Sequence, residues 1–476
     1  MVLLYRDRAT EVNHIQAFGG ESLQPPVPFE PMLLFGSFAA MLILGVLLRA
    51  TVPFLQKFLM PACLIGGIIG LVLIGLGVLD FSSADIKTFA YHFFNISFIS
   101  VGLTGNGNPS TTDPGDKSYL KGPLWMALTQ NAIFPMQAIV GGLLVIAFGL
   151  IGFKLFPTFG FFAPLGFEEG PGQALSFGKV WEEFGFSSAT TIGLTFATVG
   201  FFFSFFVGVP LANWGIRKGF AAHGPKTLPR DLLVGILTRN QEAESAGKLP
   251  FHSGNVESLA FQTALVGFVY ILTYAFVKYA GMIVPADVAS ILWGFFFIFG
   301  LGIAILVRLA MGRFNIAHLA DAGIQRRITG WSVDFLIVAT VMAIELAVVW
   351  EYIVPISVIT LVVGIMTTFA IVYLGKRIWS YNLERMVAIY GTVTGTVSCG
   401  LLLLRIVDPE FKTPVAIDIA IMNIFSIPGI GLCLVLVNGP VWWDWSTGLT
   451  ILVFSGVMIL ALALLKIFKL WGEPKF

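Results

Sequence analysis

Long apolar segments separated by short polar loops run through nearly the whole chain. A helix needs about 20 consecutive apolar residues to cross roughly 30 Å of hydrocarbon, and many segments of this sequence reach that length. The pattern predicts an all-α polytopic membrane protein with eleven spans. The predicted spans cover residues 31–48, 58–79, 89–105, 122–153, 187–214, 256–281, 286–308, 332–350, 353–375, 414–437 and 446–470.

Two further segments, residues 160–186 and 383–412, are partly apolar but interrupted by glycine. For the loop charges to stay on one side of the membrane, each segment must leave and return on the same face, so each is predicted to form a re-entrant hairpin. Non-helical backbone is tolerated at membrane depth only where it is buried in protein or lines a wet cavity. The two hairpin tips are therefore the first candidates for a binding site.

Both halves of the chain show five spans with one hairpin between the fourth and the fifth. An odd number of spans makes the second copy enter the membrane from the opposite side, which is how inverted-topology repeats arise. The predicted units are an N-terminal tail (1–30), a first inverted repeat (31–214), a cytoplasmic connector (215–255), a second inverted repeat (256–437) and an extra transmembrane helix with its tail (438–476).

Positive residues fall on alternate loops, and cytoplasmic loops are the ones that retain Lys and Arg. This bias predicts an N-terminus outside and a C-terminus inside, in a bacterial cytoplasmic (inner) membrane. The residues that set the bias include Arg49, Lys57, Arg217, Lys218, Arg308, Arg313, Lys376, Arg377, Lys466 and Lys469.

Composition excludes several classes of function. Charged residues make up only 12% of the chain, against about 25% in ordinary soluble proteins, and mean hydropathy is +0.87. A net charge of +1 leaves no basic surplus for binding nucleic acid. The sequence has no CxxC pair and lacks the HExxH, P-loop, GxGxxG and GxSxG signatures, so we expect neither an enzyme nor a zinc site, and no cofactor besides a coupling ion.

The first hairpin concentrates carboxylates and helix-breaking residues at its tip. Proline and glycine should end one helix and leave a new N-terminus at about Gln173, where an anion can bind, while unwound carbonyls can hold sodium. An ordinary extracellular turn with solvated glutamates is the alternative, although the surrounding Ala, Leu and Phe residues favour burial. The substrate-binding residues predicted here are Gly170, Pro171, Gly172 and Gln173, next to Glu168 and Glu169.

The second hairpin combines glycines with hydroxyl side chains. Small residues let the backbone approach a ligand, and hydroxyl and carbonyl oxygens suit a hard cation such as sodium. The spacing of Gly391 and Gly395 equally fits simple helix packing, and the two interpretations are compatible. Predicted substrate contacts are Gly391, Thr392 and Gly395, and predicted sodium ligands are Thr394, Thr396 and Ser398.

Polar residues inside spans are functional candidates by default, although each can also cap or bridge helices. Asn131 and Asn423 are predicted to orient the substrate. Four carboxylates are candidates for coupling solute movement to an ion: Glu168, Glu169, Glu345 and Asp418.

Five short motifs also stand in a characteristic order. They are a Pro-then-Gly-Gly segment at 58–67, Gln-Asn-Ala at 130–132, and the segments 185–190, 197–200 and 329–333. With the position of the second hairpin, they make residues 35–435 resemble the bacterial sodium/glutamate symporter family. The resemblance implies two inverted five-span halves with a re-entrant loop in each, sodium-coupled uptake, and a homodimer with a moving transport part.

The hairpin tips depart from the family pattern. A Gly-Gly-His-Gly-Thr-Gly type tip is replaced by residues 167–172, which bring in Glu168 and Glu169, and a His-Cys-Gly-Phe-Gly-Leu-Gly type tip is replaced by 389–395. Unpaired, desolvated carboxylates would repel a dicarboxylate by several kcal/mol. The substrate therefore stays open between a glutamate-like amino acid and another organic anion.

The sequence thus predicts a secondary active transporter that works by alternating access, with an elevator-type movement as one option, and couples a small organic solute to sodium in the lipid bilayer. The alternatives are a proton-coupled carrier of another organic acid or amino acid, using Glu168, Glu169 or Glu345, and a channel whose facing half-helices line a pore. Ion replacement during reconstituted uptake separates sodium from proton coupling. Saturable counterflow excludes a channel.

Overall fold

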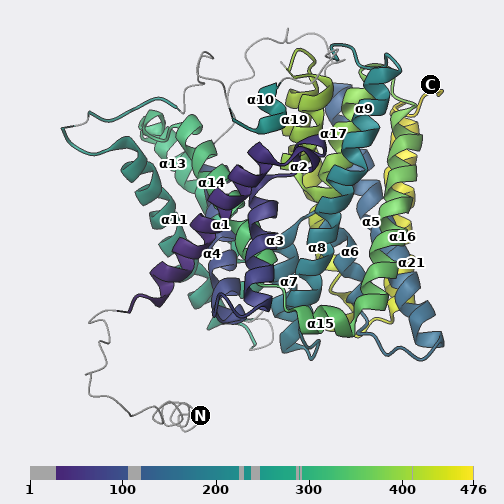
Figure 1. Cartoon of the computed structure of the whole chain (residues 1–476), viewed down its shortest axis with the longest axis horizontal. Helices are drawn as coiled ribbons and strands as arrows, with labels where there is room; N and C mark the ends of the chain where they lie inside the picture. The colour runs from purple at the N-terminus through teal and green to yellow at the C-terminus, as the bar shows by residue number, and fades with distance from the viewer. Residues whose placement is uncertain are drawn as a thin grey trace.

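The computed structural model describes residues 28–104, 120–224, 230–236, 247–252, 254–285, 289, 292–409 and 411–474. Every regular element in these ranges is a helix, as the sequence predicts (Figure 1). Most of the predicted N-terminal tail (1–30) and parts of the connector (215–255) lie outside the described residues.

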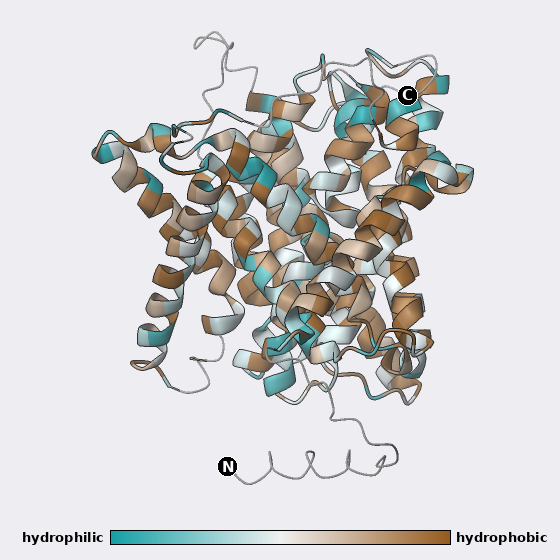
Figure 2. Ribbon diagram, turned by 60° about the vertical axis from the view of Figure 1, so that its left-hand side comes forward, coloured by the Kyte–Doolittle hydropathy of each residue, from teal (hydrophilic) through white to brown (hydrophobic). Residues whose placement is uncertain are grey.

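Eight of the described helical segments are long and apolar enough to cross a membrane. Figure 2 shows hydrophobic residues along most of the long helices, with hydrophilic residues concentrated toward the two ends of the molecule. The eight segments are α1 (Glu30–Thr51), α5 (Lys121–Leu150), α8 (Ala189–Phe206) continued by α9 (Gly208–Arg217), α11 (Ser258–Gly281), α13 (Phe296–Arg313), α16 (Ile353–Gly375), α19 (Val415–Leu436) and α21 (Thr447–Ile467).

The other three predicted spans fall on helices that are shorter or more polar than these eight. The predicted span 58–79 contains α3 (Ala62–Gly75), which has only 14 residues. The predicted spans 89–105 and 332–350 fall on α4 (Ser83–Thr104) and α14 (Ala322–Met342), and both of these helices carry charged residues. Length and composition therefore support eight of the eleven predicted spans.

Four short helices form two pairs at the positions predicted for the hairpins. The first pair is α6 (Phe162–Phe167) with α7 (Pro171–Glu183), and the second is α17 (Asn382–Gly395) with α18 (Val397–Val407). The remaining short elements are α2 (Pro53–Lys57), η2 (Phe159–Phe161), α10 (Arg230–Val234), η3 (Ala317–Leu319), α15 (Leu346–Glu351) and α20 (Gly439–Trp442).

The helices gather into two bundles that each draw on both halves of the chain (Figure 1). The first bundle contains α1, α3 and α4 together with α11, α13 and α14. The second contains α5 to α9 together with α16 to α19 and α21. Both helix pairs belong to the second bundle, and α7 and α8 make most of its contacts with the first bundle, against α4 and α14.

Glycines set how closely α1 and α3 approach in the first bundle. A Cβ atom at Gly45 would overlap the carbonyl of Ala62, and one at Gly66 would overlap the carbonyl of Met41. Membrane helices lack a hydrophobic drive to associate in lipid, so close backbone packing at small residues takes its place. Gly66 thus has a packing role within the Pro-then-Gly-Gly segment noted in the sequence.

The two helix pairs are attached at opposite ends of α19. Near the start of α17, Arg385 Nε donates to Asp418 Oδ2 at 2.8 Å, in the first turn of α19. Near the end of α7, Trp181 Nε1 donates to Asn438 Oδ1 at 2.8 Å, just beyond the last turn of α19. At 1.5 Å per residue these attachments are roughly 30 Å apart, about the thickness of the hydrocarbon core.

Candidate functional site

The first helix break lies between α6 and α7. Gly170 has φ +88° and ψ −174°, a conformation that residues with a Cβ atom rarely adopt. Pro171 then occupies the first position of α7, where its missing N–H removes no helical hydrogen bond. The new helix therefore begins two residues before the predicted position, Gln173.

The second helix break lies between α17 and α18, at Thr396. This residue has φ +134° and ψ 169°, which is strained for a β-branched side chain. Its backbone N–H donates to the carbonyls of Gly391 and Thr392 at 3.3 and 3.2 Å and closes the end of α17. Backbone strain of this kind is typical of binding sites, where the surrounding structure holds it in place.

The two breaks touch each other. A Cβ atom placed on Gly170 would lie 2.6 Å from Thr396 Cγ2 and 4.0 Å from the carbonyl oxygen of Gly395. The N-termini of α7 and α18 and the C-termini of α6 and α17 therefore converge at one place. Helix N-termini favour anions and helix C-termini favour cations, so this junction can hold an anionic group beside a cation.

The carboxylates of the first break have different surroundings. Glu169 is half-buried, and its Oε2 accepts a hydrogen bond from Gln173 Nε2 at 3.0 Å. Glu168 is only 4% exposed, and neither of its carboxylate oxygens has a hydrogen-bond partner among the described residues. Buried polar groups are almost always satisfied, so Glu168 is exceptional.

Gly172 connects this break to the first bundle. A Cβ atom at Gly172 would overlap the aromatic ring of Phe94 on α4. The tip of the first helix pair, which is part of the second bundle, thus lies directly against the first bundle.

The hydroxyl groups of the second break divide into engaged and open ones. Thr392 Oγ1 donates to the Ala388 carbonyl at 3.0 Å. Thr394 Oγ1 lies 2.7 Å from the Tyr390 carbonyl and 2.7 Å from Ser204 Oγ on α8. The two hydroxyls nearer the start of α18 are more accessible, because Thr396 is half-buried and Ser398 is exposed.

Gly391 and Gly395 have close neighbours in the structure. A Cβ atom at Gly391 would lie 2.7 Å from the backbone of Cys399, and one at Gly395 would overlap Ser204 Oγ. Gly391 thus lets α17 pack on α18, as the packing interpretation of the sequence proposed. Gly395 lies at the break itself and also touches α8.

Two polar residues at the second break were not singled out from the sequence. Gln137 on α5 is fully buried, and its Nε2 donates to the Val393 carbonyl at 2.9 Å and to Thr367 Oγ1 at 3.2 Å. Ser204 meets Thr394 as described above. An amide within an apolar span was the signal that identified Asn131, and it applies equally to Gln137; a serine within a span carries no comparable signal.

Of the two predicted substrate-orienting residues, Asn131 lies at the contact of α5 with α19. Asn131 Nδ2 donates to the Ala127 carbonyl at 2.9 Å, and its Oδ1 faces Gly429 of α19 with no hydrogen-bond partner among the described residues. Asn423 is half-buried on α19. On the neighbouring position of α5, Gln130 Oε1 accepts from Ser426 Oγ at 2.8 Å.

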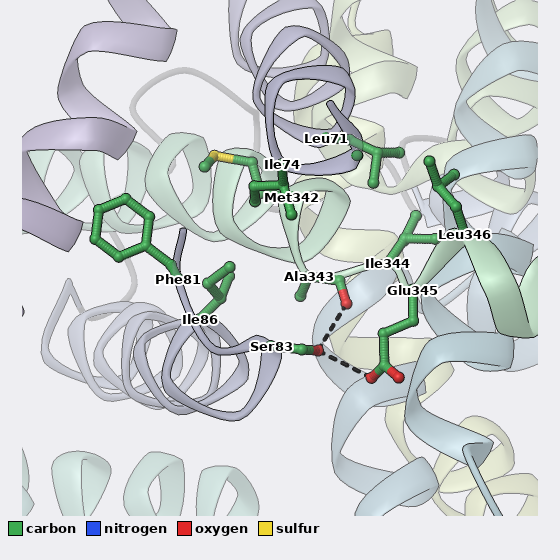
Figure 3. A pocket seen from close by; sticks show the side chains of 11 residues that line it. Leu71, Ile74, Phe81, Ser83, Ile86, Met342, Ala343, Ile344, Glu345 and Leu346 are labelled. Atoms are coloured by element: carbon green, nitrogen blue, oxygen red, sulfur yellow. Dashed lines mark hydrogen bonds between the residues drawn. The ribbon is translucent and has the colours of Figure 1, made fainter. Parts of the chain in front are cut away.

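The predicted span 332–350 would place Glu345 inside a helix, and this prediction is wrong. In the structure α14 ends at Met342, and Glu345 is the residue just before the first turn of α15. Its Oε1 accepts from Lys87 Nζ at 2.7 Å, from Ser83 Oγ at 3.0 Å and from Thr191 Oγ1 at 3.2 Å. Figure 3 shows Ser83 between Glu345 and the Ala343 carbonyl, at a pocket of about 110 Å³.

These contacts fix the charge of Glu345. Burial alone would raise the pKa of its carboxyl, but the Lys87 ammonium and the hydroxyls of Ser83 and Thr191 outweigh burial and hold the pKa below its ordinary value. Glu345 is therefore an ionised partner of Lys87 in a contact that joins α4, α8 and α15.

Asp418 is also paired. Its side chain is 4% exposed and that of Arg385 is 5% exposed, and the pair is 2.8 Å apart. A Cβ atom at Gly122 of α5 would lie 2.5 Å from both charged groups, so glycine is needed for α5 to pass the pair. The pair lies at the start of α17, at the opposite end of that helix from the break.

Comparison with protein families gives one result for this chain. The model of the family described as sodium/glutamate symporter matches residues 34–397, which include both helix breaks. No individual curated protein matches the chain.

Proposed function

The chain belongs to the sodium/glutamate symporter family, and from this premise we propose that its two helix breaks together form the site that binds a small organic solute and sodium. The family makes the protein an integral membrane protein that couples transport to sodium. The observation that carries the proposal for the site is the contact of Gly170 with Thr396, which brings four helix ends to one junction.

We further propose that α6–α7 and α17–α18 are re-entrant hairpins within inverted repeats at 31–214 and 256–437. Their attachments at opposite ends of α19 support insertion from opposite faces. In each half, the first three helices join the first bundle and the later ones join the second, which supports a repeat. Residues 215–255 then act as connector and 438–476 as an added helix.

Alternating access follows if the second bundle moves as a unit against the first, as in an elevator. Both breaks belong to the second bundle, so the whole site would travel with it. Contact with the first bundle is made mainly by α7 and α8. Coupling arises because solute and sodium complete one polar site, so that the empty and fully loaded states can cross the membrane at low cost.

The residues at the junction take separate roles in this proposal. The open hydroxyls of Thr396 and Ser398, with Thr394, supply oxygens to sodium. The start of α7, from Gly170 to Gln173, receives an anionic group of the solute. Thr392, Gly391 and Gly395 line the other side, and Asn131 and Asn423 orient the solute.

The solute is proposed to be a glutamate-like amino acid or another small organic anion, because two helix N-termini face the junction. We propose that the protein lies in the bacterial inner membrane with its N-terminus outside. Figure 1 shows α2, α9, α10 and the C-terminal end on one side, and the Lys and Arg bias supports a cytoplasmic location for that side. A homodimer follows from the family resemblance alone.

Ligand-induced stabilisation of the purified protein tests this function. L-glutamate and a panel of small organic acids are added in sodium chloride or in choline chloride of equal ionic strength, and thermal unfolding is recorded. A true substrate raises the unfolding temperature only with sodium. At a concentration 100-fold above Kd it adds about 2.7 kcal/mol to the free energy of unfolding.

The matched variants are Gly170→Val, which should lose this effect, and Gly302→Val, which should keep it. A Cβ atom at Gly302 would have no atom of the described residues within 4 Å beyond its own stretch of helix. Equal stabilisation in choline contradicts sodium coupling. Single-channel currents from reconstituted protein contradict a carrier.

A further inference from the structure

The four carboxylates considered for coupling differ in their partners. Asp418 is paired with Arg385, and Glu345 is paired with Lys87. Glu169 is half-buried and accepts a hydrogen bond from Gln173. Glu168 is buried like Asp418, and it is the one of the four with both oxygens unpartnered among the described residues.

Among the described residues, no positive charge is built in near Glu168. The helices α8 and α16, which pack on α6, contain no charged residue. The charged residues of α5, α7, α17 and α19 lie near helix ends remote from the break: Lys121 on α5, Lys179, Glu182 and Glu183 on α7, Glu384 and Arg385 on α17, and Asp418 on α19. The titratable groups that face Glu168 are Glu169 on its own segment and the thiol of Cys433 from α19.

The surroundings are also poor in ligands for a metal ion. The side-chain amide of Gln130 lies beside the Glu168 carboxyl, and the oxygen of that amide already accepts from Ser426 Oγ, so it is not free to bind a cation. A thiol is a soft ligand that a hard cation such as sodium does not select. The residues described contain no group of three His, Cys, Asp or Glu side chains placed to hold a metal ion. An isolated ionised carboxylate is very costly in such a place, whereas a neutral carboxylic acid is not.

We propose that Glu168 is a proton-binding site of the carrier, so that a proton moves together with the solute. A proton from water on one side of the membrane binds to a carboxylate oxygen of Glu168, and the same proton returns to water on the other side. Binding removes one negative charge next to the helix N-terminus that receives the anionic solute. The solute and the proton therefore favour each other's binding, which is coupling. This inference rests on the proposed function and adds a proton to its sodium.

Infrared difference spectroscopy of the full-length protein in lipid tests the protonation without any solute. A protonated carboxyl has a carbonyl stretch separate from carboxylate and amide bands. We expect this band in the wild type at neutral pH, its loss in Glu168→Gln, and its retention in Glu169→Gln and Asp418→Asn. An unchanged band in Glu168→Gln overturns the proposal. So does a carboxylate band that shifts with sodium in the wild type and not in Glu168→Gln, because Glu168 would then be a sodium ligand.

Solute binding at different pH tests the coupling. Binding of L-glutamate in sodium should weaken by about tenfold per pH unit on the alkaline side of the Glu168 titration, the slope of one bound proton. Glu168→Gln mimics the protonated acid and should bind with no such slope, whereas Glu169→Gln should keep it. A wild-type slope in Glu168→Gln overturns the coupling. Loss of sodium-dependent binding for every solute in wild type would instead refute the proposed function, and the infrared result would be unaffected.

Discussion

The two helix pairs share a geometry but differ in chemistry. Each consists of a helix, a break with positive φ and a second helix, and the two breaks meet. The first pair has carboxylates at its break and is attached to α19 by the neutral hydrogen bond from Trp181 to Asn438. The second has hydroxyls at its break and is attached by the buried ion pair of Arg385 with Asp418.

This difference distinguishes the backbone conformation that the fold needs at each break from the side chains that a ligand would need there. At each break the chain must end one helix and begin the next within one to three residues. The positive φ of Gly170 does this at the first break, and the strained positive φ of Thr396 does it at the second. The side chains around the breaks are free to differ. In our account the first break carries the proton and receives the anion, and the second supplies oxygens to sodium.

The largest expected effect is on stability, at the two side-chain contacts that attach the helix pairs to α19. Arg385→Ala leaves Asp418 buried without a partner and should destabilise the protein by about 3–5 kcal/mol. Trp181→Phe leaves a neutral acceptor on Asn438 unpaired and should cost about 1–3 kcal/mol. Thermal unfolding of both variants in the same detergent compares them. A smaller loss for Arg385→Ala than for Trp181→Phe would mean that the ion pair does not anchor the second pair.

The second largest effect is expected from substitutions of the glycines at the two breaks. Gly172→Val forces a side chain into the Phe94 ring, and Gly395→Val forces one against Ser204 Oγ, so each should abolish uptake. Overpacking costs about 1–3 kcal/mol, so the protein should still fold and insert. Uptake into proteoliposomes and detergent gel filtration separate the two effects, with Gly302→Val as the control. Full activity in both break variants would contradict the assignment of the tips.

The smallest effect is expected at the pair of Lys87 with Glu345, whose glutamate side chain is 43% exposed. Solvent screens such a pair, so Glu345→Gln should cost less than about 1 kcal/mol, far below the buried pair. Because the pKa of Glu345 is lowered in the folded protein, its stabilising contribution is present above the ordinary carboxyl range and is lost as pH falls through the lowered pKa.

Thermal unfolding from neutral to acidic pH, compared between wild type and Glu345→Gln, measures that loss. The difference between the two proteins should shrink on acidification. A difference that grows toward acid would show that the carboxylate is not held ionised by Lys87.

Much of the fold could be predicted from local pattern. The lengths of the apolar segments predicted the long helices. Gly and Pro predicted the positions of both breaks closely, because these residues act through their own backbone. The α3, α4 and α14 spans were harder to support, since they are short or carry charges.

The partners of the carboxylates could not be predicted. Glu345 meets Lys87 across 258 positions of the chain, and Asp418 meets Arg385 across 33. No local pattern distinguishes a carboxylate with a distant partner from one without. The four carboxylates therefore looked alike in the sequence, and only the fold separates Glu168 from the rest.

A cryo-electron microscopy structure of the protein in lipid nanodiscs tests the central claim most directly. We expect Gly170 to contact Thr396, with both residues near the middle of the lipid belt and the two helix pairs inserted from opposite faces. Breaks that lie apart, or that lie in solvent outside the belt, would contradict it.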